Sequence, residues 1–235
     1  MTRARIAVVV FPGSNCEHDI AEALAACGSE PRIIWHEETA LDADAVVLPG
    51  GFAHGDYLRP GAIARFSQVM GPVGAFAASG GPVLGICNGF QVLTEAGLLP
   101  GALRRNDGLR FICDTVACTV TSTSSVLTGR ATLGARLRLP INHYEGAYSC
   151  DRATLATLER DDRIVLRYDA NPNGSLAAVA GVSSRSGNVV GLMPHPERAS
   201  DALLGSTDGI VLLSSFVESA AIFAADRQLP ASARS

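Results

Sequence analysis

One short segment of this 235-residue chain carries the residue types of a covalent catalyst. Gly85-Ile86-Cys87-Asn88-Gly89 has the form glycine–x–nucleophile–x–glycine, between an expected buried strand and an expected helix. The glycines let strand and helix approach without a Cβ clash, so that the nucleophile can occupy a strained turn. The helix N-terminus favours a thiolate, and the backbone N–H of Asn88 would face a developing oxyanion. The segment predicts a catalytic Cys87, against the alternative of a buried cysteine on a glycine-rich turn.

A thiolate nucleophile needs a base, and a second cluster supplies one. His195 directly follows a strand expected at 189–193, and Glu197 stands two residues later, beyond Pro196. Residues i and i+2 of an extended segment point the same way, so Glu197 can accept a hydrogen bond from the imidazole. Alone, these residues would indicate a loop histidine beside a surface glutamate. Beside the cysteine turn they predict a triad of Cys87, His195 and Glu197.

Two further positions could complete the site. Pro49-Gly50-Gly51-Phe52 follows a strand expected at 45–48, so the backbone at Gly51 can join Asn88 as an oxyanion donor. Any tight turn would also use two glycines. Gln91 lies one turn after Cys87 on the same helix face and can reach a substrate. The remaining histidines are not spaced as metal ligands, and no metal site is predicted.

The elements that must position these residues alternate along the chain. Buried strands are expected at 6–10, 32–35, 45–48 and 83–86, and helices at 20–27, 63–78 (with a break near Gly71-Pro72) and 90–96. Residues 111–139 indicate antiparallel strands; further strands are expected at 164–168, 176–182 and 189–193, and a closing helix around 213–220. This order predicts an α/β fold: a three-layer, doubly wound, mostly parallel, flavodoxin-like sheet with added antiparallel strands. Such sheets bind ligands at the carboxyl ends of their strands, where Cys87 and His195 are expected.

Composition bounds the remaining possibilities. Length favours a single domain over residues 1–235, with a frayed tail from about residue 226. The net charge is −4, and no basic run supports a nucleic-acid or membrane-surface role. All 19 basic residues are arginine, which excludes Schiff-base lysine chemistry and a P-loop lysine within the chain. The apolar N-terminal run is too short for a signal peptide or membrane span, which predicts a cytoplasmic protein with free thiols at its six cysteines.

The motifs resemble those of a known enzyme family. Residues 85–91 and 194–197 look like the signatures of class I, triad-type glutamine amidotransferases. Segments 11–19, 50–59, 171–175 and 193–198 resemble the branch of that family that serves de novo purine biosynthesis. The resemblance runs from about residue 5 to about residue 225, with departures at Ala53-His54, Pro60, Asn142 and Tyr144.

The resemblance implies a function that these residues can carry. Cys87 would attack L-glutamine to form a thioester, and Gln91, Asn142 and His143 would bind the substrate. The ammonia would pass to a separate ATP-dependent synthetase subunit that converts formylglycinamide ribonucleotide to formylglycinamidine ribonucleotide, with a small third subunit in the complex. No cofactor is expected in this chain; ATP and magnesium would bind the partner. Asp56 and Arg59, at the rim of the site, would contact that partner.

Two other classes of protein remain open from the residues. A different Cys–His hydrolase, peptidase-like or deglycase-like, could use the same triad, although it leaves 171–175 and 56–59 unexplained. A non-catalytic, flavodoxin-like binding module would share the fold, but the sequence has no glycine-rich phosphate loop. Thioester formation at Cys87 with a glutamine analogue separates the three.

Overall fold

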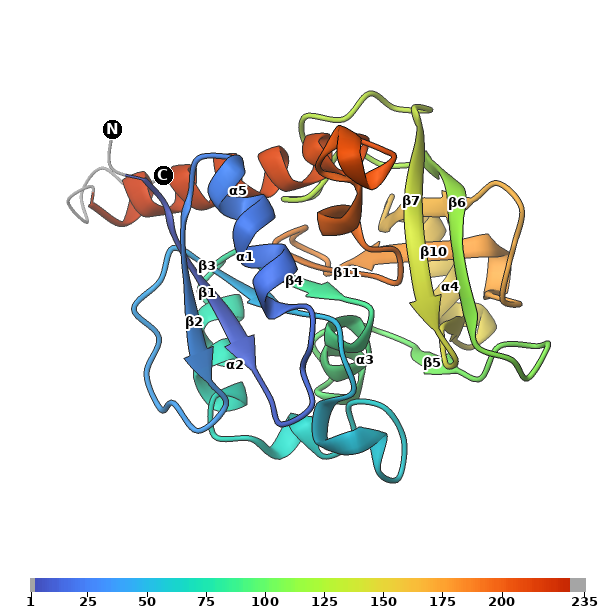
Figure 1. The fold of residues 1–235 in the computed structure, drawn as a ribbon, viewed down its shortest axis with the longest axis horizontal. Coiled ribbons are helices and arrows are strands. Elements are labelled where there is room, and N and C mark those ends of the chain that lie inside the picture. The colour runs from blue at the N-terminus through green and yellow to red at the C-terminus, as the bar shows by residue number, and fades with distance from the viewer. Residues whose placement is uncertain (1–2, 229–235) are drawn as a thin grey trace.

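A nine-stranded sheet forms the middle layer of the computed structural model, which describes residues 3–228 (Figure 1). The strand order is β2-β1-β3-β4-β11-β10-β9-β6-β7. The bounds are β1 (Arg5–Val10), β2 (Glu30–Trp35), β3 (Ala45–Leu48), β4 (Val83–Ile86), β6 (Ile112–Val120), β7 (Arg136–His143), β9 (Ile164–Tyr168), β10 (Val179–Ser183) and β11 (Val189–Leu192). From β2 to β11 the neighbours pair in parallel, and from β11 to β7 they pair antiparallel. The predicted fold class is confirmed.

The parallel half is covered on both faces. Strands β3, β4 and β11 are buried along their whole length, as continuous apolar runs require. Helices α1 (Glu17–Ala26) and α5 (Gly209–Gln228) lie on one face, and α2 (Met70–Ala78) and α3 (Asn88–Glu95) lie on the other (Figure 1). The two strands that precede the predicted nucleophile and base are neighbours, with Ile86 opposite Leu192. Their carboxyl ends therefore deliver Cys87 and His195 to one edge of the sheet.

Several local predictions differ from the structure. The single helix expected at 63–78 is two elements, a 3-10 turn η2 (Ala64–Phe66) and then α2. The break between them comes before Met70 and not near Gly71-Pro72. Pro72 lies in the first turn of α2, where proline is tolerated. Residues Leu176–Ala178 form a 3-10 turn, η3, and not the start of a strand. Helix α4 (Arg152–Arg160) was not predicted. Asp151 caps it, because its carboxylate accepts from the Thr154 N–H at 2.7 Å. Strands β5 (Ala102–Arg104) and β8 (Ala147–Ser149) add a two-stranded sheet.

The closing helix α5 is longer than predicted. It includes residues 226–228 of the predicted frayed tail, and the rest of that tail lies outside the described residues. The segment Gly209–Arg227 has a mean hydropathy of 1.6, so by length and composition alone this helix could cross a membrane. A core helix passes the same test, and α5 buries Leu212, Leu213 and Phe216 in the core of this domain. One face of α5 therefore packs against the core of the α/β fold, and the other face is exposed.

Candidate active site

Cys87 occupies a strained turn between β4 and α3. Its φ of 50° and ψ of −105° lie outside the regions that L-residues favour, a conformation that costs about 1–3 kcal/mol. The flanking glycines are required sterically: a Cβ at Gly89 would lie 1.9 Å from the carbonyl oxygen of Leu48, and one at Gly85 would lie 2.7 Å from Gly89. The turn is held by the Cys87 N–H, which donates to Leu192 O at 2.8 Å. The sulfur lies 3.7 Å from the carbonyl oxygen of Asn142, beside the N-terminus of α3.

His195 and Glu197 form a buried pair at the same edge. The Nδ1 atom of His195 lies 2.6 Å from Oε1 of Glu197, and the two side chains are 2% and 0% exposed. The His195 N–H donates to Pro140 O at 2.8 Å, which fixes the segment after β11 against β7. Among residues 3–228, neither Nε2 of His195 nor Oε2 of Glu197 has a hydrogen-bond partner. The free Nε2 is the atom that a base would use.

The protonation of His195 follows from its neighbours. Burial by itself would lower the pKa of the imidazole, but the Glu197 carboxylate and Cys87 outweigh burial and raise the pKa to about 10. His195 is therefore an imidazolium at neutral pH whenever it is paired with these two groups.

We expect His195 to titrate near pH 10 in the folded chain. Its folded pKa is raised above 6.5, so its contribution to stability is fully present below pH 6.5 and is lost as the pH rises toward 10. Nitrogen-15 NMR of histidine-labelled protein measures the titration directly. An imidazole that deprotonates near pH 6.5 would contradict the pairing with Glu197.

The turn predicted to supply the second oxyanion donor packs against His195. Gly50 has no room for a side chain, because a Cβ there would lie 2.8 Å from Cε1 of His195. Gly51 has φ of +146° and bridges to Ser14, and a Cβ there would lie 2.7 Å from the Ser14 Cα. These contacts place the Gly50-Gly51 backbone beside the edge where Cys87 and His195 meet.

Asn88 joins that turn to the substrate side of the site. Its Oδ1 accepts from the Ala53 N–H at 2.9 Å, and its Nδ2 donates to Asp56 at 3.2 Å and to Gln91 at 2.9 Å. Gln91 in turn donates to the carbonyl oxygen of Glu145 at 2.6 Å. Burial, and then the negative charge of Glu145, raise the pKa of Asp56 to about 6. Asp56 therefore lies inside this polar network as well as on the rim.

Arg59 is exposed and forms an ion pair within the chain. Its guanidinium binds both carboxylate oxygens of Glu95, at 2.6 and 2.7 Å. The positive φ values of Asp56 and Leu58, 54° and 69°, turn the backbone between Asp56 and Arg59. Asp56 and Arg59 do not pair with each other, because Asp56 bonds to Asn88 and Arg59 bonds to Glu95 on α3.

His143 is buried near His195, and Asn106 fixes its tautomer. Nδ2 of Asn106 donates to the carbonyl oxygens of Arg110 at 2.9 Å and of His143 at 3.0 Å, so Oδ1 must face the imidazole. Nδ1 of His143, 3.2 Å from that Oδ1, therefore carries the proton, and Nε2 is a buried lone pair without a partner. Burial, followed by His195, lowers the pKa of His143 to about 4. His143 is thus a neutral acceptor.

The 171–175 segment, whose role the sequence did not reveal, supports the turn after His143. Asn173 is buried and donates to Gly146 O at 2.9 Å, and the Ser175 hydroxyl accepts from the Tyr148 N–H at 3.1 Å. Sequence reasoning missed Asn106 and gave no role to Cys16 or Arg198, although the last two stood inside family-like segments.

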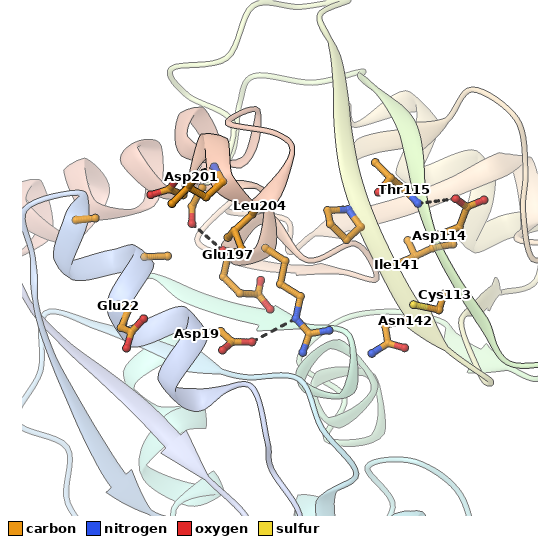
Figure 2. Close-up of a pocket in the computed structure, with 16 residues that line it drawn as sticks. Asp19, Glu22, Cys113, Asp114, Thr115, Ile141, Asn142, Glu197, Asp201 and Leu204 are labelled. Atoms are coloured by element: carbon orange, nitrogen blue, oxygen red, sulfur yellow. Dashed lines mark hydrogen bonds and ion pairs between the residues drawn. The ribbon is translucent and has the colours of Figure 1, made fainter.

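An open cleft of about 940 Å³ lies beside Glu197. Figure 2 shows Asp19 and Glu22 on α1 across from Ile141 and Asn142 on β7.

A possible metal site lies near this cleft, because potential metal-binding atoms lie within 4.8 Å of one another on Cys16, His195 and Glu197. The Arg198 guanidinium, 3.1 Å from the Cys16 sulfur, places a positive charge there and so disfavours a divalent cation.

Comparisons with known proteins agree with this geometry. The model of a family described as a CobB/CobQ-like glutamine amidotransferase domain matches residues 3–209. Phosphoribosylformylglycinamidine synthase subunit PurQ of Rubrobacter xylanophilus is 58% identical over 219 residues, which cover 93% of this chain and all of the relative. The PurQ subunit of Parasynechococcus marenigrum is 58% identical, with 88% of this chain and 97% of the relative covered. The solved structure of PurLQS from Thermotoga maritima contains a chain with a TM-score of 0.86 and 41% identity, which covers 92% of this chain and 99% of that chain.

Proposed function

Because this chain belongs to the CobB/CobQ-like glutamine amidotransferase family, we propose that it is the glutaminase subunit of a phosphoribosylformylglycinamidine synthase. It hydrolyses glutamine and supplies ammonia for the conversion of formylglycinamide ribonucleotide to formylglycinamidine ribonucleotide in purine biosynthesis. The observation that carries the proposal is the strained Cys87 turn beside the buried His195–Glu197 pair. PurQ relatives at 58% identity disfavour a peptidase, a deglycase or a non-catalytic module.

Acyl transfer at this site follows from the positions of the side chains. The Cys87 thiolate attacks the amide carbon of glutamine, and backbone N–H groups at Gly51 and Asn88 stabilise the oxyanion. His195 gives its proton to the departing nitrogen, and ammonia leaves a glutamyl thioester. His195 then takes a proton from water as the water attacks the thioester; the C–S bond breaks, which releases glutamate and restores the Cys87 thiolate and the protonated His195. Glu197 orients the imidazole and stabilises its protonated form.

Glutamine binds on the side of Cys87 that Gln91, Asn142 and His143 form. Gln91 is held between Asn88 and the Glu145 carbonyl, so its amide is preorganised. The carbonyl oxygen of Asn142 lies next to the Cys87 sulfur. The neutral Nε2 of His143 accepts a hydrogen bond and, with its lowered pKa, does not protonate ammonia.

The chain works with other subunits. The T. maritima relative is named as part of PurLQS, which supports an assembly with a synthetase subunit and a small third subunit. This chain has no lysine and therefore no P-loop lysine for ATP, so we place ATP on the synthetase. ATP and magnesium bind the synthetase, and this chain needs no cofactor of its own. Ammonia must remain neutral to act as a nucleophile, so it passes directly between subunits in the cytoplasm.

The loop that carries Asp56 and Arg59 is the docking surface for the synthetase. Tyr57 and Leu58, between them, are 74% and 89% exposed, which is unusual for large apolar side chains. The same loop is tied to Asn88 through Ala53 and Asp56, so docking can reach the oxyanion donors. Arg59, fixed by Glu95, holds the end of the loop on α3.

Arg59→Ala is expected to leave the chain folded while lowering glutamine hydrolysis in the complex by about tenfold, because loss of the Glu95 contact loosens the docking loop. Titration of wild type and variant with the synthetase subunit gives the stimulation curves. Arg32→Ala removes another exposed, ion-paired arginine, on strand β2, and serves as the matched control. Superimposable curves for Arg59→Ala and wild type would return Arg59 to an ordinary surface role.

The proposed function itself is tested by reconstitution. The purified chain is expected to consume glutamine rapidly only after the synthetase subunit, the small subunit, ATP and formylglycinamide ribonucleotide are added. Glutamate and formylglycinamidine ribonucleotide should form in equal amounts. Glutamine turnover that ignores the partners, or its absence from the full mixture, contradicts the proposal.

A further inference from the structure

The charges around Glu197 are arranged unusually. Its Oε1 receives the hydrogen bond of His195, while its Oε2 is buried and has no partner. The guanidinium of Arg198, on the next residue, does not bond to that oxygen. Instead Nε of Arg198 donates to Asp19 at 3.3 Å, and Nη2 donates to the sulfur of Cys16 at 3.1 Å. Arg198 and Glu197 are adjacent in sequence and interact electrostatically, yet within residues 3–228 they form no ion pair.

Cys16 lies near both Arg198 and Glu197. It is the residue before α1, is 2% exposed, and donates its thiol proton to Asn15 Oδ1 at 3.2 Å. Its sulfur lies within 4.8 Å of ligand atoms of both His195 and Glu197. Burial, and then Glu197, raise the pKa of the Cys16 thiol to about 12, so it remains neutral at physiological pH. A neutral sulfur can accept from Arg198 without carrying a competing negative charge.

We propose that Cys16 is a positioning residue of the triad. Its thiol binds the Arg198 guanidinium and keeps the guanidinium from bonding to the Glu197 carboxylate. The inference rests on the proposed function, since it assigns Glu197 to the support of His195. Cys16 acts through Arg198 and does not touch the substrate.

The physical reason is competition for one carboxylate. A guanidinium bonded to Glu197 would neutralise much of the charge that stabilises the imidazolium. Arg198 instead donates hydrogen bonds to Asp19 and Cys16, so the Glu197 carboxylate remains bonded to His195 only. The other titratable groups that face His195 are Cys87 from the turn after β4 and His143 from β7, and neither contacts Arg198. Figure 2 shows the Asp19 end of this arrangement on the wall of the cleft.

Cys16→Ala tests the inference. It removes the acceptor of Nη2 and opens space beside Oε2 of Glu197, so Arg198 is expected to bond to Glu197. The His195 titration in the full-length chain should then move from near pH 10 toward 6.5, by about one unit or more. Histidine nitrogen-15 NMR measures the shift, and the alkaline limb of kcat/KM for glutamine in the reconstituted complex should move in the same direction.

Three variants separate positioning from packing. Cys16→Ser retains an acceptor for Arg198 and should keep the titration close to that of wild type. The double variant Cys16→Ala/Arg198→Met removes the competing cation, so it should restore the His195 titration to that of wild type. Cys27→Ala removes the thiol at the opposite end of α1 and should change nothing.

The inference is overturned by an unchanged titration in Cys16→Ala, or by a shift that persists in the double variant. The NMR measurement requires no glutamine. Its failure is therefore distinct from failure of the proposed function, which would appear as a wild-type complex without glutaminase activity.

Discussion

Cys87→Ser is expected to abolish glutamine-dependent synthesis by the reconstituted complex, with a loss on the order of 10⁴-fold or more. A serine hydroxyl ionises far less readily than a cysteine thiol, so serine is a much poorer nucleophile in the strained turn beside His195. Synthesis from added ammonium salts should continue at a rate within about twofold of wild type, because the synthetase chemistry lies outside this chain. Glutamate release and product formation, measured with each nitrogen source, give the two rates.

Cys150→Ser is the matched control for Cys87→Ser. Cys150 is half-buried, follows β8 and takes no part in the site, so this variant should retain both activities. Circular dichroism and thermal unfolding establish that each variant is folded. Glutamine hydrolysis by Cys87→Ser near the wild-type rate would remove Cys87 from the role of nucleophile.

His195→Ala and Glu197→Gln are expected to differ in severity. His195→Ala removes the group that we propose as the general acid and base, so a loss of about 10⁴-fold or more in kcat/KM for glutamine is expected. Glu197→Gln keeps a side chain of the same shape 2.6 Å from Nδ1 but removes the charge, so a smaller loss of about 10²–10³-fold is expected.

The pH profile shows which function Glu197 performs. Loss of its carboxylate should lower the His195 pKa from about 10 and move the alkaline limb of kcat/KM to lower pH. Glu218→Gln changes an exposed glutamate on α5 and provides the control for loss of one negative charge. Wild-type activity and an unchanged profile in Glu197→Gln would exclude Glu197 from the triad.

The sequence by itself determined the framework of the site. A continuous apolar run such as 83–86 indicates a strand buried on both faces, and glycine at 85 and 89 indicates a close approach of that strand to the following helix. Because parallel strands end at one edge of the sheet, Cys87 and His195 could be placed together without coordinates. The i, i+2 spacing similarly put Glu197 next to His195.

Helix α4 escaped prediction because its burial comes from packing in the tertiary structure and not from a long apolar stripe; Leu158 is its one fully buried side chain. The partner of Arg59 could not be foreseen either, since the turn at Leu58 decides whether its guanidinium meets Asp56 or Glu95.

Only the tertiary structure decided how charge is distributed around the triad. Arg198 and Cys16 are 182 residues apart in the chain, and Asn106 and His143 are 37 apart, yet these pairs fix a guanidinium and a tautomer within the same site. Local patterns report which face of a strand or helix is buried, but the pKa of a buried group depends on each charge and dipole within a few ångströms, whatever its position in sequence. The sequence therefore identified the groups that react, and the packing of distant segments set the protonation states in which they do so.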